Sequence, residues 1–198
     1  SIQPTIGLSV KGFSVSVWGS TELAFNKGKN KKEVDYTLAY TVSGFKVAFT
    51  DYWWEGEDAF NYFNYKKDKT PHLFEGTLAY TLPVEKFPLT MAWNTIFAGN
   101  DRKPDNDPYY STYVELSCPF HVKEVVDLNV VFGFTPWKSP AIVPDATLHR
   151  GFRICNVVLG ASKALKITDS FSLPLFTQVI WNPALDDVHL VFGLSLKY

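Results

Sequence analysis

The sequence predicts an all-β protein, a transmembrane antiparallel up-and-down β-barrel of about 12 strands, with about 11 of them in this chain. Apolar and polar residues alternate with a period of two in one segment after another, which is the pattern of strands with two unlike faces. Most of these segments reach about ten residues, enough for a tilted crossing of a bilayer. Short turns alternate with long polar loops, as in outer-membrane barrels. Residues 1–198 are expected to form a single barrel domain.

The composition excludes several other classes of protein. The 19 basic residues are offset by 20 acidic ones, with no long basic run beyond Lys27–Lys32, so no nucleic-acid partner is expected. There is no stretch of about 18 apolar residues, which a membrane helix would need. The mean hydropathy of -0.06 would suit a soluble protein, but a barrel gives the same average because its two faces cancel. The start carries no signal segment, so a mature or trimmed chain is expected.

The clearest strand is the C-terminal segment. From Val188 to Tyr198, every second residue is apolar or aromatic, while the intervening positions include His189, Gly193 and Ser195. The same alternation recurs around residues 34–43, 113–120 and 126–135. The expected strands cover residues 4–10, 13–23, 33–43, 45–55, 70–82, 87–98, 109–121, 124–137, 151–165, 169–182 and 186–198.

The connections indicate which end of the barrel faces the periplasm. Short turns are expected at Lys11-Gly12, Ser43-Gly44, Pro83–Lys86, Val122–Lys123 and Thr168-Asp169, and long loops at 24–32, 56–69, 99–108 and 138–150. Outer-membrane barrels keep their short turns on the periplasmic side. Since the last strand ends on that side, counting back places the start of the chain outside. The usual even strand count then predicts one more strand before Ser1.

The polar face of the strands is expected to line the lumen, because it carries mainly small Ser, Thr, Ala and Gly side chains that suit a crowded interior. A soluble β-sandwich also alternates, but its dense apolar face points inward. The larger lumen-lining residues are expected to be Glu22, Asp35, Lys46, Glu75, Asn94, Glu115, Asp127, Asn156, Gln178, Asn182 and His189. Their charges either pair across the barrel and fill it, or line a path with a slight cation preference.

Aromatic residues gather near both ends of the apolar face, with Val, Leu and Ile between them. Amphipathic rings settle at the level of the lipid headgroups, so two such girdles favour a membrane barrel over a soluble one. The expected membrane-interface aromatics are Phe13, Tyr40, Phe45, Trp53, Phe74, Tyr80, Phe87, Tyr110, Phe120, Trp137, Phe171, Trp181 and Tyr198.

Few residues point to chemistry. Cys118 and Cys155 are expected to face outward at different depths as unpaired thiols, and Arg153, of the same parity as Cys155, to reach toward the headgroups. His189 near Asp186 and Asp187 is a weak catalytic signal, and no catalytic or zinc-binding motif is present. We therefore expect no enzymatic activity, no cofactor and no metal.

One loop is rich in aromatic residues. The segment Tyr52–Tyr65 either binds a sugar or a partner by stacking, or combines the upper girdle with a loop that packs on itself; we favour the second.

Four segments resemble a known family: Gly7–Glu22, DYWW at 51–54, KITDSFSLP at 166–174 and DDVHLVFGLSL at 186–196. They are similar to the small outer-membrane β-barrel porins of Bacteroidetes, the TorF-type porin group. The resemblance covers essentially the whole chain and consists of strand and turn patterns. It implies an outer-membrane barrel, and the aromatic C-terminus resembles the signal that the barrel-assembly machinery reads. It implies little about the solute.

These observations favour a porin-like passive channel for small solutes in the outer membrane of a Gram-negative bacterium, in contact with outer-membrane lipid. The alternative is a non-conducting accessory barrel that binds a partner protein in the same membrane. A soluble lipocalin-like carrier ranks lower, because it would need the apolar face turned inward.

Overall fold

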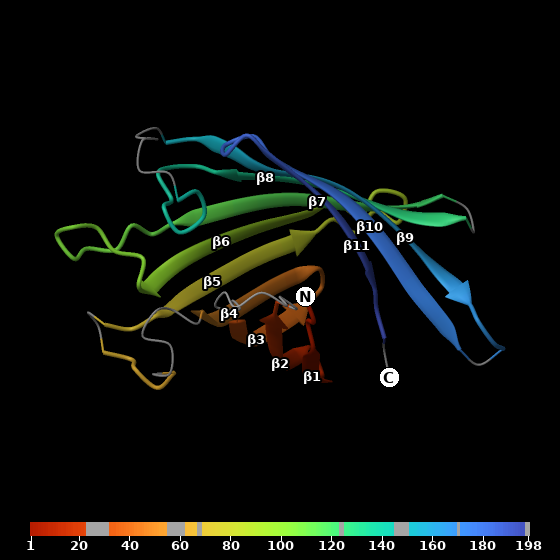
Figure 1. The fold of residues 1–198 in the computed structure, drawn as a ribbon, viewed down its shortest axis with the longest axis horizontal. Helices are drawn as coiled ribbons and strands as arrows, with labels where there is room; N and C mark the ends of the chain where they lie inside the picture. Colours follow the sequence, from red (N-terminus) through yellow and green to blue (C-terminus); the bar gives the residue numbers. More distant parts are fainter. Residues whose placement is uncertain are drawn as a thin grey trace.

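The computed structural model describes residues 1–22, 32–54, 62–66, 69–122, 125–144, 151–169 and 171–196. Within these ranges the chain forms eleven strands and no helix (Figure 1). The strands are β1 Thr5–Val10, β2 Phe13–Thr21, β3 Lys32–Val42, β4 Phe45–Trp54, β5 His72–Thr81, β6 Thr90–Gly99, β7 Thr112–Val122, β8 Val126–Thr135, β9 Arg153–Lys166, β10 Ser172–Asn182 and β11 Asp187–Leu194. Among the described residues no helix could span a membrane.

All eleven strands form one antiparallel sheet in which each strand pairs with its neighbours in sequence. The up-and-down all-β prediction is thereby confirmed. The sheet is strongly curled but open, so the closed barrel is not what the structure contains: β1 and β11 are edge strands (Figure 1). Because the number of strands is odd, β1 and β11 run in the same direction, and an antiparallel closure would need one more strand between them.

Strand ends differ from the expected ones where the backbone chemistry changes. The turn between β5 and β6 spans residues 82–89 rather than 83–86, because Pro88 lacks the N–H that a strand pairing needs. β7 begins at Thr112, two residues after Tyr110, whose φ of 53° is incompatible with an extended strand. β8 ends at Thr135, immediately before Pro136.

Two hairpin turns are built alike. Lys11-Gly12 and Ser43-Gly44 are two-residue turns in which both residues have positive φ, the type I′ geometry that matches the twist of the flanking strands. Gly12 O and Gly44 O each accept a hydrogen bond of 2.9 Å from the next strand, from Thr41 N and Thr81 N. These contacts attach each turn to the strand beyond it and define the short-turn end of the sheet.

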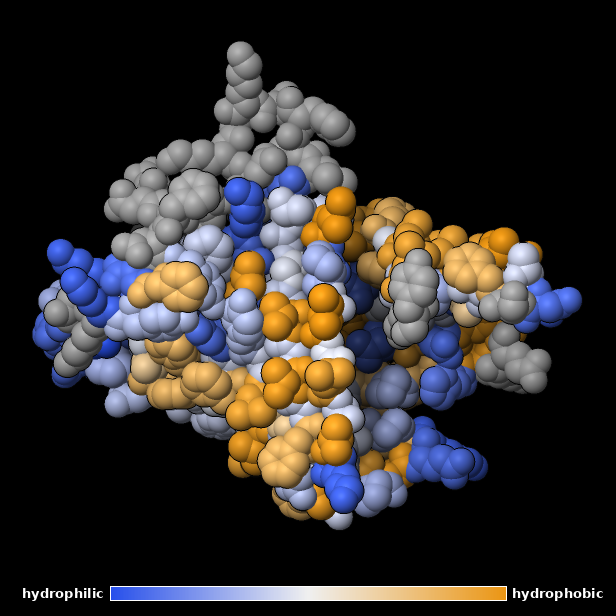
Figure 2. All heavy atoms as spheres, turned by 90° about the horizontal axis from the view of Figure 1, so that it is seen from below, coloured by the Kyte–Doolittle hydropathy of each residue, from blue (hydrophilic) through white to orange (hydrophobic). Residues whose placement is uncertain are grey.

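The two faces of the sheet differ in polarity. The apolar face is exposed: Leu8 is 79% and Phe192 72% accessible. The opposite face carries small buried side chains such as Ala39, Ala48 and Ala79. Viewed from below, apolar side chains gather on the outer surface, and hydrophilic ones lie deeper in a hollow beside them (Figure 2). The exposure of large apolar side chains over most strands is far greater than in an ordinary soluble domain.

A bulge in β9 overturns two expectations about facing. Gly133 of β8 is opposite Asn156 and Phe134 is opposite Ile154, so Cys155 has no partner of its own in β8. Cys155 borders the cavity described below, so it does not face outward. The bulge also shifts the parity beyond it, and Arg153 pairs with Thr135 on the inner face instead of reaching toward headgroups. Cys118 and Cys155 are both buried and unpaired, as expected of free thiols.

Candidate functional site: the polar inner face

The inner face encloses a cavity of about 880 Å³. Its lining comes from strands as far apart as β3, through Thr37, and β11, through Asp187 and His189. Because β3 and β11, eight strands apart in the sheet, border one cavity, the sheet must curl around it. Ala141 and Ile142, from the segment that follows β8, also contribute to its wall.

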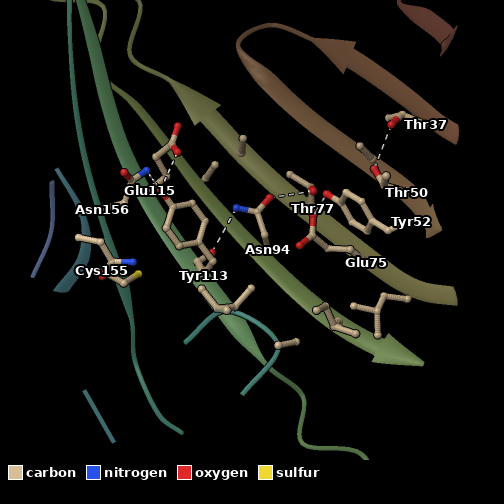
Figure 3. A pocket seen from close by; sticks show the side chains of 18 of the residues that line it. Thr37, Thr50, Tyr52, Glu75, Thr77, Asn94, Tyr113, Glu115, Cys155 and Asn156 are labelled. Carbon is tan, nitrogen blue, oxygen red and sulfur yellow. Dashed lines mark hydrogen bonds between the residues drawn. The ribbon is translucent and has the colours of Figure 1, made fainter. Parts of the chain in front are cut away.

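Hydrogen bonds run along this wall from strand to strand (Figure 3). Thr37 bonds Thr50 at 3.1 Å, and the Tyr52 hydroxyl donates to Glu75 at 2.9 Å. The Thr77 hydroxyl donates to the side-chain oxygen of Asn94 at 2.9 Å. These bonds join β3 to β4, β4 to β5, and β5 to β6. They satisfy polar groups that would otherwise be costly to bury.

This series of side-chain hydrogen bonds continues from Asn94 over three further strands. The Asn94 amide donates to Tyr113 O at 3.2 Å, and the Tyr113 hydroxyl donates to Glu115 at 2.8 Å. The same hydroxyl accepts a bond of 2.9 Å from Asn156, two strands away on β9. It can do so because Gly133 of β8 lies beneath the ring: an added Cβ there would overlap the Tyr113 hydroxyl and ring. A glycine in this strand thus permits a long cross-strand contact.

The same hydrogen bonds help to distinguish charges that pair across the barrel from charges that line a path along its wall. Among the described residues, each side-chain bond named above lies within one strand or joins strands at most two apart, and none of them spans the cavity. The carboxylates on the wall are Glu75, Glu115 and Asp187, and Lys46 is the lysine among them. His189 Nε2 lies 2.8 Å from Asp187 Oδ2. The wall thus combines polar groups, with an excess of acidic ones, and apolar side chains such as Leu73, Ile96 and Ile180.

The structure brings many of the expected lumen residues together. Those that border the cavity are Lys46, Glu75, Asn94, Glu115, Asn156, Asn182 and His189. The others lie elsewhere. Glu22 is exposed just beyond β2, and Asp127 is exposed near the short-turn end, where it lies 2.6 Å from His121. Asp35 and Gln178 are half-buried outside the cavity wall.

Asp35, on the inner face, has an unsatisfied side-chain oxygen. Its Oδ1 is buried without a hydrogen-bond partner. Asp35 pairs in register with Tyr52, whose hydroxyl is already bonded to Glu75. An unpartnered buried carboxylate oxygen costs free energy unless it finds a proton, water or a cation.

The expected interface aromatics form several local clusters. At the short-turn end Phe13 packs on Tyr40 and Phe45 on Tyr80, each with ring centroids 4.4 Å apart. Phe87 lies 6.2 Å from Phe120 in the same way. At the long-loop end Trp137 lies 5.8 Å from Trp93 and donates to Tyr110 O at 2.8 Å. Phe171 and Trp181 are exposed, and Tyr198 lies outside the described residues.

Sequence reasoning missed a polar cluster on the outer face. His72 is fully buried, with Nδ1 2.6 Å from Asp51 Oδ1 and Nε2 2.6 Å from Tyr62 O. Tyr65 stacks on the imidazole at 4.4 Å. Tyr62 and Tyr65 therefore pack onto the outside of the sheet and shield the pair, together with Trp53 and Phe74. Burial raises the pKa of the Tyr62 phenol, so it stays neutral there. Residues 55–61 of the same loop lie outside the described residues.

The described residues offer no group of three His, Cys, Asp or Glu side chains able to hold a metal ion. No protein-family model, curated protein or solved structure matches the chain.

Proposed function

We propose that this chain is an outer-membrane β-barrel protein of a Gram-negative bacterium that conducts small solutes passively along its polar inner face. The observation that carries the proposal is the inverted polarity of the sheet. Large apolar side chains are exposed on the outside, whereas hydrogen-bonded polar side chains, among smaller numbers of large apolar ones, line an inner cavity of about 880 Å³. Lipid is the natural partner of such an exterior, and water and polar solutes are the natural contents of such an interior.

Conduction requires a continuous wall, so the proposal includes closure of the sheet in the membrane. Since β1 and β11 run in the same direction, one additional strand between them would complete an antiparallel barrel of twelve. The excess of Glu75, Glu115 and Asp187 over Lys46 on the wall favours cations.

Planar-bilayer recording of the refolded protein tests this proposal. We expect stable conductance steps and a reversal potential in a KCl gradient that indicates a modest preference for K⁺. Glu115→Gln should reduce that preference and Lys46→Gln should increase it. Glu85→Gln is the matched control, because Glu85 is exposed on the turn between β5 and β6, away from the cavity.

A folded protein that inserts into bilayers but passes no current would overturn the channel. That result would favour the accessory barrel, whose partner would then be sought in the same membrane. The lipocalin-like carrier is poorly supported, because its apolar interior is missing: the apolar face is the exposed one.

A further inference from the structure

A second cavity lies at the long-loop end of the inner face. Its volume is about 400 Å³, and it is bordered by the ends of β4 and β5, the loop between β6 and β7, and the segment after β8. Trp54, Leu73 and Ala141 border both this space and the larger cavity, so the two adjoin. We call the smaller space the mouth pocket. Its size is at the lower end of the range for small-ligand sites, enough for one sugar ring rather than a chain.

A guanidinium that forms no ion pair with a described carboxylate, that of Arg102, borders the mouth pocket. Arg102 donates from Nη1 to Asn106 O at 2.8 Å, but its Nε is buried and has no partner. The adjacent Asp101 does not serve it, because the Asp101 oxygens accept from Ser111 N at 2.8 Å and Ser111 Oγ at 2.9 Å. Because Nε is shielded from the open space, the Nη groups are the donors that a ligand can reach, and a carboxylate is the acceptor that a guanidinium pairs with best.

The rest of the lining suits a ring with hydroxyl groups. Trp54 stacks on Tyr52 at 5.5 Å and 13°, which fixes the indole plane, and yet the side chain remains 39% exposed. Tyr109 and the Asn100 amide also border the pocket, and the Lys138 ammonium lies 5.6 Å from the centre of the Tyr109 ring. Aromatic surfaces beside amide and cationic donors match the apolar faces, hydroxyls and charge of an acidic sugar.

We propose that the mouth pocket binds a monosaccharide that carries a carboxylate, with Arg102 pairing with the carboxylate and Trp54 and Tyr109 bordering the sugar ring. The proposal does not depend on conduction, because binding can be measured on the detergent-solubilised protein. The site and the proposed channel can therefore fail separately.

The test is calorimetric titration of the full chain, folded in detergent, with D-glucuronate, D-glucose and benzoate. We expect glucuronate to bind and glucose to bind at least about tenfold more weakly, since it lacks the partner of the guanidinium. Arg102→Gln should lower the affinity for glucuronate by about the same factor. Lys103→Gln is the matched control: it removes one positive charge from the same loop, but Lys103 is exposed and does not border the pocket.

Because Arg102 also supports its loop, the thermal unfolding of each variant is recorded, and Trp54→Leu serves as a second probe that leaves the loop bond intact. Equal binding of glucuronate and glucose, or equal losses in the Arg102 and Lys103 variants, would overturn the carboxylate assignment. Binding of benzoate without glucuronate would overturn the sugar assignment. No binding of any probe would overturn the site.

Discussion

At the scale of single residues, the inner face depends on glycines that give room to large side chains. Tyr113 crosses β8 above Gly133 to reach Asn156. Phe176 likewise lies over its direct partner Gly193, where an added Cβ would overlap the ring. In both places the missing side chain lets an aromatic ring lie flat along the wall instead of projecting into the cavity.

Gly133→Ala should destabilise the protein by about 1–3 kcal/mol, because the new methyl group overlaps Tyr113 and breaks its bond to Asn156. The measurement is denaturant unfolding in detergent micelles. Gly160→Ala, on the neighbouring β9, is the control, since its Cβ would meet Gln178 at an ordinary 3.5 Å. In a Tyr113→Ala background the Gly133→Ala cost should largely vanish. A cost that persists there would show that Tyr113 is not the cause.

At the scale of elements, the hairpins β1–β2 and β3–β4 repeat one design. Each has a two-residue type I′ turn ending in glycine, then a phenylalanine that packs on a tyrosine of the following strand. Gly44 has a φ of 85°, and an added Cβ would come 2.8 Å from Thr81 O. Ser43 tolerates its positive φ of 48° less readily than Asn or Gly would.

Gly44→Ala should therefore lower stability by about 1–2 kcal/mol through left-handed strain. Ser43→Asn should be neutral or stabilising, because Asn adopts that conformation more easily. Unfolding midpoints of both variants, compared with Gly76→Ala in β5, where the nearest atom is 3.8 Å from the Cβ, provide the check. Equal midpoints for Gly44→Ala and Gly76→Ala would contradict the turn assignment.

At the scale of the whole molecule, the two faces of the sheet offer neighbouring residues opposite environments. Leu38 is 52% exposed in the middle of β3 and lies between Val15 and Phe49, both exposed on the same face. Its neighbour Thr37 borders the large cavity. The two residues are adjacent in sequence, but Leu38 lies on the exposed apolar face and Thr37 on the inner face.

Leu38→Arg should make the free energy of folding into lipid vesicles less favourable by about 2–4 kcal/mol. This is the cost of a charged side chain on the lipid face near the bilayer centre. Thr37→Arg, which places the same charge in the polar interior, should be tolerated far better. Folding yield and unfolding midpoint in vesicles measure the difference. In a water-soluble protein the order would reverse, since an arginine on an exposed surface costs little and one in the interior costs much.

The sequence by itself determined the strands and their two faces. The period of two, as in Val34–Val42 or Val188–Leu196, is a local property of each strand and survives in the structure to within a few residues at each end. Turn glycines such as Gly12 and Gly44 are local signals of the same kind.

Only the tertiary structure decided features that depend on contacts between distant segments. The bulge at Cys155, which turns Arg153 inward, arises from how β8 and β9 are paired, and the alternation within β9 does not reveal it. Tyr62 and Tyr65 cover His72 through the folding of a loop, and Arg102 and Trp54, which lie far apart in sequence, border the same mouth pocket. Periodicity fixes where a side chain points along its own strand, but the path of loops and the register between strands follow from packing over the whole chain.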